Sequence, residues 1–196
     1  MSAYGLRSRV GTGIGAWINP AFGGLGITTF GSFESIGTLT VGAGGSGAVS
    51  FNSIPQTYKH LQLRAMSRNS GDNISLRATF NSDNTSIYTL HELYSGGASV
   101  ATASQVNIAY YPCALSGPAS ISGVFGVSIT DILDYTNTNK FKTARTLTGY
   151  DANGGGYVEL TSGVWRSTSA ITSITIVPNA GTMAQYSHFS LYGVKG

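Results

Sequence analysis

The fold is decided by three consecutive stretches: Tyr58-Lys-His-Leu-Gln-Leu-Arg-Ala65, the turn cluster Asn69-Ser-Gly-Asp-Asn73, and Ile74-Ser-Leu-Arg-Ala-Thr-Phe80. In the first stretch, Leu61, Leu63 and Ala65 alternate with polar side chains, and the third stretch alternates in the same way. A period of two is typical of a β-strand that buries one face, and Asn, Asp, Ser and Gly form the turns between such strands. The pattern predicts consecutive antiparallel strands.

The same pattern of short apolar runs and turn clusters continues from residue 33 to the C-terminus. Asp151-Ala-Asn-Gly-Gly-Gly156 is a strong hairpin signal because Asn and Gly accept a positive φ. With the two stretches above, about ten strands are expected, and no helix longer than a turn or two. The sequence therefore predicts an all-β fold, an antiparallel two-sheet sandwich of jelly-roll type. The further strands are expected at 33–41, 48–51, 87–94, 105–111, 121–130, 142–150, 157–164, 171–177 and 188–194.

Composition agrees with an all-β protein. The chain has 196 residues, of which 10% are charged and 41% hydrophobic, and Gly, Ser and Thr together make up more than a third. Thr, Tyr, Val and Ile favour strands, and this hydrophobic content excludes a disordered chain. The length suits one domain with a short appendage.

Residues 1–32 differ from the rest, since large apolar side chains stand between glycines with neither a strand nor a helix period. Glycine at this density disfavours an independent element, yet the apolar side chains are unfavourable in water. We expect an extended Gly-rich apolar arm over 1–32, which binds a partner surface, and a β-sandwich domain over 33–196. The expected partner-binding residues of the arm are Arg7, Arg9, Trp17, Ile18, Phe22, Leu25 and Ile27.

Charge and cysteine content narrow the classes of partner. The net charge of +3 is weak and scattered, whereas nucleic-acid binding needs a clustered basic face. No nucleic acid and no membrane is expected as a partner.

The N-terminus lacks the apolar core of a signal peptide. Cys113 is the only cysteine, so an internal disulfide is impossible, and it is expected to be buried as a small hydrophobe.

The motif search predicts no catalytic, cofactor-binding or metal-binding residues. Gly42-Ala-Gly-Gly-Ser-Gly47 matches G-x-G-x-x-G, but a strand-like run follows it, so a hairpin loop is expected. Asp131 and Asp134 are expected in a solvated loop. The remaining candidates were the histidines His60, His91 and His188, expected at the surface, and Asp72, Asn81 and Asp83, which are too few for Ca²⁺.

Aromatic residues leave two interpretations open. Trp165, Tyr110, Tyr111 and Tyr157 could form a platform on which a sugar ring stacks, or they could fill the core and interfaces. The sequence favours the second interpretation.

Three stretches resemble small structural proteins of tailed bacteriophages. They are Ser50-Phe-Asn-Ser-Ile-Pro-Gln-Thr-Tyr-Lys-His-Leu-Gln-Leu-Arg64, Gly163-Val-Trp-Arg-Ser-Thr-Ser-Ala-Ile-Thr-Ser-Ile-Thr-Ile176, and the ending Tyr186-Ser-His-Phe-Ser-Leu-Tyr-Gly-Val-Lys195. The resemblance implies a β-sandwich virion component on capsid exteriors or in tail and fibre structures, commonly a homotrimer, and it supplies no catalytic residue.

Two functions are therefore expected as alternatives. The leading one is a capsid decoration (cement) protein, assembled in the host bacterial cytoplasm and docked in the virion on the major capsid protein or another virion protein. The other is a tail, fibre or adaptor protein whose sandwich binds a host-surface glycan. An enzyme is disfavoured because paired acids and a nucleophile motif are not evident in the sequence.

Overall fold

Twelve antiparallel strands form two sheets in the part of the chain that the computed structural model describes, residues 32–72 and 74–196. The eight-stranded sheet has the order β1 (Phe33–Thr40), β12 (His188–Val194), β3 (His60–Ser67), β8 (Gly126–Leu133), β9 (Lys142–Asp151), β10 (Gly156–Trp165), β5 (Tyr88–Ser95) and β6 (Val100–Ile108). The four-stranded sheet has the order β2 (Val49–Phe51), β11 (Ile174–Pro178), β4 (Ser75–Phe80) and β7 (Tyr111–Leu115).

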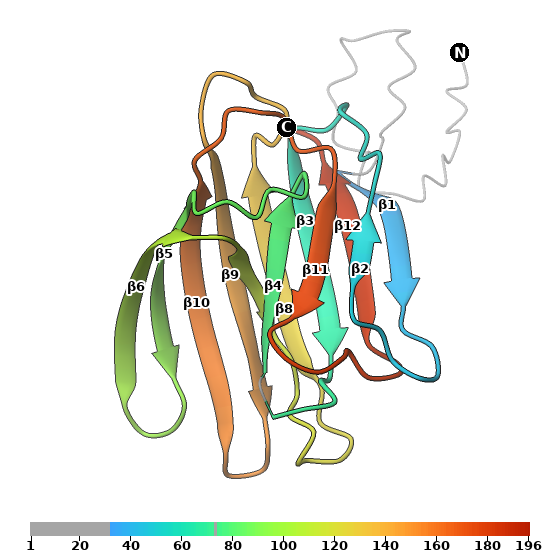
Figure 1. Ribbon diagram of the computed structural model, residues 1–196, viewed down its shortest axis with the longest axis vertical. Helices are drawn as coiled ribbons and strands as arrows, with labels where there is room; N and C mark the ends of the chain where they lie inside the picture. The colour runs from blue at the N-terminus through green and yellow to red at the C-terminus, as the bar shows by residue number, and fades with distance from the viewer. Residues whose placement is uncertain (1–31, 73) are drawn as a thin grey trace, which may run out of the picture. The chain divides into compact units, whose positions relative to one another are not determined.

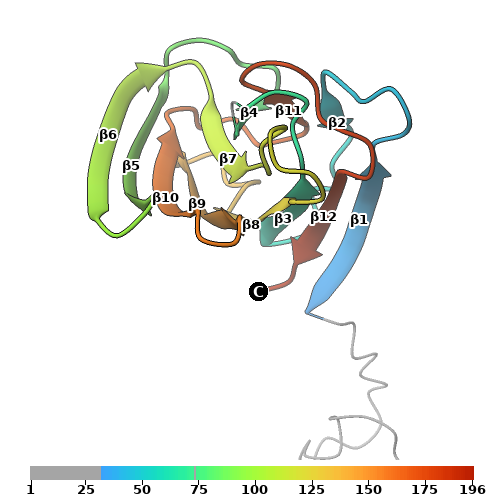
Figure 2. The same ribbon diagram turned by 90° about the horizontal axis from the view of Figure 1, so that it is seen from below.

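The small sheet covers only part of the large one. In Figure 1, β2, β4 and β11 lie in front of the β1–β12–β3–β8 side, while β5, β6 and β10 extend beyond them. Figure 2 shows that the large sheet curves, so that β5 and β6 rise at one end towards the level of the small sheet. The large sheet therefore has an inner face, turned to the small sheet, and an outer face that no described element covers.

The core lies between the two sheets and is rich in aromatic rings. The Phe80 ring packs edge-on against Trp165, with the centroids 5.7 Å apart, and its centroid is 6.0 Å from that of Tyr88. The Tyr88 hydroxyl accepts from the Phe80 amide and donates to the Asp83 carbonyl, and the Trp165 indole donates to the Asp83 carboxylate at 3.0 Å. These bonds satisfy the polar ends of rings that are otherwise buried.

The two-sheet antiparallel fold predicted from the sequence is confirmed, while the jelly-roll assignment stays a prediction. The strand expected at 188–194 has those bounds, and the hairpin expected at 151–156 joins β9 to β10. The buried face expected for Leu61, Leu63 and Ala65 is also confirmed.

Three sequence-based expectations about the secondary structure were wrong. The single strand expected at 105–111 is the end of β6 and the start of β7, because the chain passes from one sheet to the other between them. Asn107, with a φ of 56°, is the extra residue of a bulge within β6, shortly before this break. Residues 42–47 do not close a hairpin, because β1 and β2 belong to different sheets. Asp131 lies within β8 rather than in the loop after it, since that strand extends to Leu133.

A buried lysine fastens the loops at one end of the core. The Lys142 side chain is fully buried, and its ammonium group donates to the carbonyl oxygens of Asn137, Lys140 and Thr168, the last at 3.0 Å. Burial is the main cause that lowers the pKa of Lys142, and the nearby Lys140 charge lowers this pKa further. The three carbonyls come from two loops, so one side chain holds both loops against β9.

Replacing Lys142 with Met should lower stability. Lys142→Met keeps the apolar stem but leaves the three carbonyls without this donor, at a cost of about 2 kcal/mol. For a domain of this size, that lowers the Tm by about 6 °C in a thermal unfolding experiment. Lys140→Met is the matched control, because the Lys140 side chain is half exposed and pairs only with Asp134. Equal Tm values for both variants would contradict this role.

Candidate functional site

The outer face of the large sheet exposes a group of neighbouring large apolar side chains, here called the apolar face. Its members are each between 41% and 57% exposed, and they lie on five neighbouring strands. They are Met66, Leu93, Val127, Ile129, Leu147, Val158 and Leu160. Together they expose on the order of 600 Å², the upper end of what a solvated monomer leaves uncovered.

These side chains point outward because the hydroxyl residues that alternate with them point inward. Thr130 and Thr146 are buried, and their hydroxyls lie 2.7 Å apart. The Thr130 hydroxyl donates to the Cys113 carbonyl of β7, and the amide of Leu115 in β7 donates to the Thr148 hydroxyl at 2.7 Å. Strand β7 therefore rests on a layer of hydroxyl groups, and the aliphatic neighbours face solvent.

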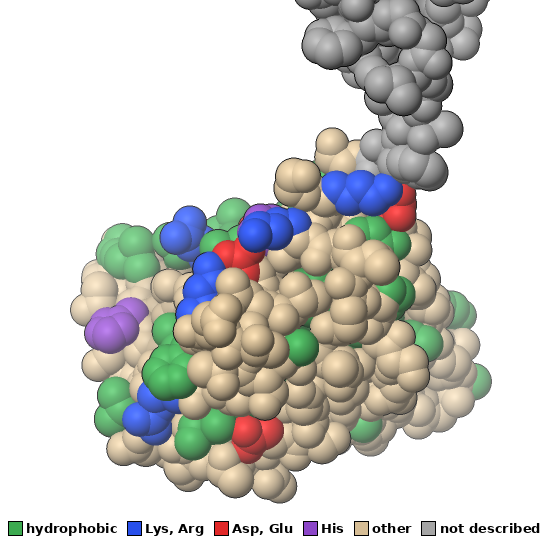
Figure 3. All heavy atoms as spheres, turned by 90° about the horizontal axis from the view of Figure 1, so that it is seen from above, with side chains coloured by type: hydrophobic (Ala, Val, Ile, Leu, Met, Phe, Trp, Pro, Cys, Tyr) green, Lys and Arg blue, Asp and Glu red, His purple; other side chains and the backbone are tan. Residues whose placement is uncertain are grey.

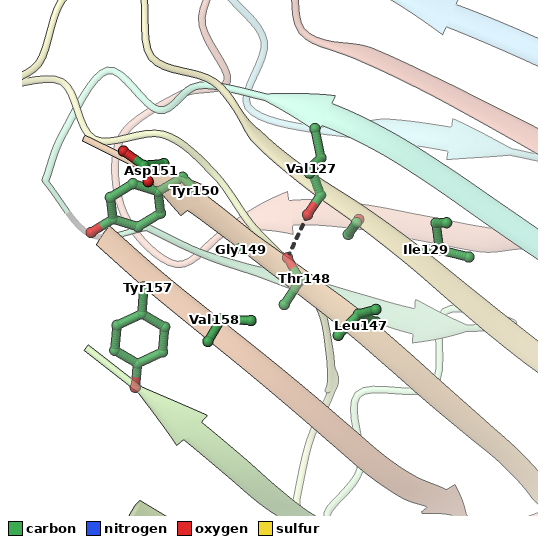
Figure 4. A pocket seen from close by; sticks show the side chains of 10 residues that line it. Val127, Ile129, Leu147, Thr148, Gly149, Tyr150, Asp151, Tyr157 and Val158 are labelled. Carbon is green, nitrogen blue, oxygen red and sulfur yellow. Dashed lines mark hydrogen bonds between the residues drawn. The ribbon is translucent and has the colours of Figure 1, made fainter. Parts of the chain in front are cut away.

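An open hollow of about 470 Å³ lies at the centre of the apolar face (Figure 4). Its floor is Gly149, and the side chains of Val127, Ile129, Leu147 and Val158 stand around it. A Cβ at Gly149 would lie 2.5 Å from the Tyr157 carbonyl oxygen, so the close approach of β9 and β10 requires glycine there. The outcome is an apolar depression with raised aliphatic rims.

Charged groups border the apolar face along the strands. Arg145 is exposed on β9, and Asp131 lies opposite it on β8, where it accepts from Gln62 at 2.8 Å. Asp151 is the last residue of β9, and its carboxylate accepts from the amide of Asn153 at 2.8 Å. No ion pair involves Arg145 or Asp151 within residues 32–72 and 74–196.

A pair of carboxylates, missed by the sequence analysis, lies on the inner face beyond the small sheet. Glu92 on β5 and Glu159 on β10 are diagonal neighbours, because Glu92 is paired with Thr161 and Glu159 with Tyr94. Glu159 is buried and accepts from the Thr161 hydroxyl at 2.5 Å. Burial, and then the Glu159 charge, raise the pKa of Glu92. No sequence spacing reveals this pair, because the two residues are far apart in the chain.

Two tyrosines stack beside this pair. The Tyr94 and Tyr157 rings are nearly parallel, with centroids 5.6 Å apart. Burial and the neighbouring carboxylates raise the pKa of Tyr157 to about 12. Of the aromatic platform residues considered from the sequence, Trp165 and Tyr111 are buried in the core. The Tyr110 ring lies under the Arg77 guanidinium at 4.0 Å, so the four residues do not form one platform.

Charged side chains also gather at the end of the molecule that carries the C-terminus (Figure 3). Asp134 forms ion pairs with Lys59, at 3.2 Å, and Lys140, and its amide donates to the His60 ring. These contacts, the hydrogen bonds from Lys140 and Lys59 first, lower the pKa of Asp134. The sequence predicted a freely solvated loop residue at Asp134. That prediction was wrong, because Asp134 is the centre of a salt-bridge cluster.

The remaining sequence candidates have local roles. His91 is exposed, as expected, whereas His188 is half-buried and contacts Thr40 and Ser190. Asp72 accepts from the amide of Ser120, in the loop after β7, and Asp83 accepts from the amide and hydroxyl of Thr85 in its own turn. Cys113 is buried, as predicted, and burial raises the pKa of its thiol to about 12.

The expected arm residues lie outside the described residues. These are Arg7, Arg9, Trp17, Ile18, Phe22, Leu25 and Ile27, so their binding role stays a prediction. Among the described residues, no three His, Cys, Asp or Glu side chains are close enough to hold a metal ion. Nor does this part of the chain contain a helix with the length and hydropathy needed to cross a bilayer. Comparison of the sequence with protein-family models and with curated proteins finds no match.

The Glu92 carboxylate gives a prediction for the pH dependence of stability. Its pKa is raised above the ordinary value of 4.5, so the folded state favours the protonated form. The favourable contribution is complete below the unfolded pKa and is lost as the pH rises through the folded pKa. Glu92→Gln should therefore raise the Tm at pH 7 by about 2 °C, the size expected for removing one like-charge pair across two strands. At pH 4 the variant and the wild type should unfold at nearly the same temperature.

Glu34→Gln is the matched control with the opposite sign. The hydrogen bonds from Lys195 and Tyr58 lower the pKa of Glu34, so neutralising this carboxylate should not raise the Tm at pH 7. Thermal unfolding of the three proteins between pH 4 and pH 8 checks both directions. A lower Tm for Glu92→Gln at pH 7 would show that the Glu92 charge is stabilising instead.

Proposed function

We propose that this chain is a structural protein of a tailed-bacteriophage virion, a capsid decoration (cement) protein that docks on the coat shell through residues 1–32. The observation that carries the proposal is the apolar face. Its aliphatic side chains face solvent while the hydroxyls of Thr130, Thr146 and Thr148 occupy the interior. Such a face is unfavourable in an isolated molecule and favourable in a protein that is covered by other subunits.

The described body also supports a role in binding rather than in catalysis. The surface of the hollow at Gly149 is mainly apolar, with four aliphatic side chains and two tyrosines among its lining residues, which suits contact with protein rather than a reaction. The proposal therefore contains no catalytic step and no cofactor. Its partners are the major capsid protein or another virion protein.

The binding of the arm is proposed from its sequence. Trp17, Phe22, Leu25 and Ile27 lie in a glycine-rich stretch, and glycines allow close approach to a partner surface. Residues 1–33 carry no acidic side chain that could pair with Arg7 and Arg9. These arginines would therefore pair with acidic groups on the coat.

A second candidate is a tail, fibre or adaptor protein that binds a host-surface glycan. The observation that favours it is the stacked pair Tyr94 and Tyr157 beside the carboxylates Glu92 and Glu159. Aromatic rings stack on the apolar faces of sugars, and carboxylates accept hydrogen bonds from sugar hydroxyls. The cement proposal is preferred because the apolar face has no part in glycan binding.

Binding of the full chain to virus particles tests the proposal. Particles assembled without this protein are mixed with the wild-type chain, and with a variant in which Trp17, Phe22, Leu25 and Ile27 are each replaced by Ser. The wild type should co-sediment with capsids in hundreds of copies per particle, and the variant should lose at least nine-tenths of this binding. Phe141→Ser, at an exposed aromatic side chain of the described body outside the apolar face, is the control that should bind normally.

The copy number and the location of the bound chain separate the alternatives. Tens of copies, located on the tail, together with loss of adsorption when the chain is missing, would favour the glycan-binding alternative. Full binding by the variant with four serines would exclude the arm as the docking segment. No binding of the wild type to any virion component would overturn the virion proposal itself.

A further inference from the structure

The outward side chains of β9 have an order that is complementary to itself. They are Arg145, Leu147, Gly149 and Asp151, with the inward residue Thr148 at the midpoint. Leu147 is a projecting side chain and Gly149 is the floor of the hollow, each one residue from Thr148. Arg145 and Asp151 carry opposite charges, each three residues from Thr148. A two-fold rotation about Thr148 therefore brings the projecting Leu147 onto the hollow at Gly149, and Arg145 onto Asp151.

We propose that a second copy of this chain covers the apolar face, through a two-fold axis that crosses β9 at Thr148. The axis lies between the outer faces of the two copies, passes over Thr148 and runs perpendicular to the strands, so β9 packs antiparallel on β9 of the partner copy. Leu147 of each copy then enters the hollow at Gly149 of the other. Arg145 of each copy meets Asp151 of the other, at both ends of the contact. An isologous contact of this kind is the commonest symmetry in protein assemblies.

The neighbouring strands agree with the same axis. One cross-strand row of the outer face contains Ile129, Leu147 and Leu160, and the next row contains Val127, Gly149 and Val158. The proposed axis lies between these two rows and places one on the other. Val127 of one copy is then opposite Ile129 of its mate, and Val158 is opposite Leu160. Every central pairing joins two apolar groups or an apolar group and the glycine.

The available area is close to what a stable dimer needs. The apolar face exposes on the order of 600 Å², and the flanking Arg145, Asp131 and Asp151 enlarge the contact towards the roughly 800 Å² that each partner buries in a typical stable complex. The layout also has the usual anatomy of an interface, with an apolar centre and a charged rim.

Arg145 and Asp151 of one copy are too far apart to form an ion pair with each other. Arg145 and Asp151 are six positions apart along β9, a distance of about 20 Å in a strand. No ion pair involves either residue in the described part of the chain. A partner copy supplies the opposite charge to both, which accounts for their positions at the two ends of the apolar rows.

This inference deepens the proposed function, and it rests on that proposal for the presence of a protein partner on the apolar face. It names that partner as a second copy, whereas the arm remains the segment that docks on the coat. The pairing of two bodies does not depend on any contact made by residues 1–32.

Charge reversal on the full chain tests the two-fold arrangement. Arg145→Asp places two like charges at each end of the contact, and Asp151→Arg does the same with the opposite sign. Each variant alone should self-associate at least tenfold more weakly than the wild type in analytical ultracentrifugation at low salt. An equimolar mixture of the two variants should recover association within about threefold of the wild type, because each mixed dimer contains two opposite-charge pairs.

Two further variants test the apolar centre and the fold. Leu147→Arg should abolish self-association, since the arginine cannot enter the hollow at Gly149. Val106→Arg, on an exposed valine of β6 outside the apolar rows, should leave association unchanged. Circular dichroism and Tm measurements identify any variant that fails to fold, including Asp151→Arg, which removes the bond to the Asn153 amide. In that case Asp151→Asn replaces it, with an expected loss of about threefold.

The outcomes distinguish the two proposals. Recovery in the mixture, with loss in each single variant, supports the two-fold pairing. A monomeric wild type, a mixture no stronger than the single variants, or normal association of Leu147→Arg would overturn it. If Leu147→Arg still binds particles as the wild type does, the decoration proposal survives whatever the result for the pair. If the wild type forms the two-fold pair but binds no particle, only the decoration proposal fails.

Discussion

The contact between β7 and the hydroxyl side chains of β8 and β9 determines which way the large sheet faces. The main chain of β7 bonds to Thr130 and Thr148, and the Tyr111 hydroxyl lies 3.0 Å from that of Thr146. Once these hydroxyls are turned inward, the alternation of the strands forces their aliphatic neighbours outward. A slip of one residue would bury those neighbours but expose the hydroxyls and leave the polar groups of β7 without partners. The exposed apolar surface is thus a consequence of the interior and not a local irregularity.

Three surfaces of the described body differ in chemistry because they lie on different parts of one curved sheet. The outer face is apolar, the inner face beyond the small sheet carries stacked tyrosines and two carboxylates, and the end near the C-terminus carries salt bridges. The salt bridges involve half-exposed lysines and contribute little to stability. The ionised form of Glu92 is unfavourable in the folded state, since burial, and then the Glu159 charge, raise its pKa. Only the apolar face combines an area, a shape and a charged rim that match a protein partner.

Much of the fold could be predicted from alternation and turn chemistry, which are local properties. The strand at 188–194 and the hairpin at 151–156 are cases where a clear period meets a clear turn. Alternation does not say which of its two faces is buried, so nothing in the sequence placed Leu147 outside and Thr146 inside. The break between β6 and β7 was missed because apolar residues continue through it. The carboxylate pair and the complementary order on β9 depend on pairing between distant strands, which a single sequence does not reveal.

The burial of Cys113 affects how the protein can be stored and labelled. Its thiol is enclosed between the sheets and resists ionisation, with a pKa of about 12, and the thiolate is the species that reacts with oxidants and alkylating reagents. Copies of the protein would therefore not cross-link through sulfur on exposure to air. A cysteine introduced at an exposed position would accept a maleimide dye or a spin label with little background from the native thiol.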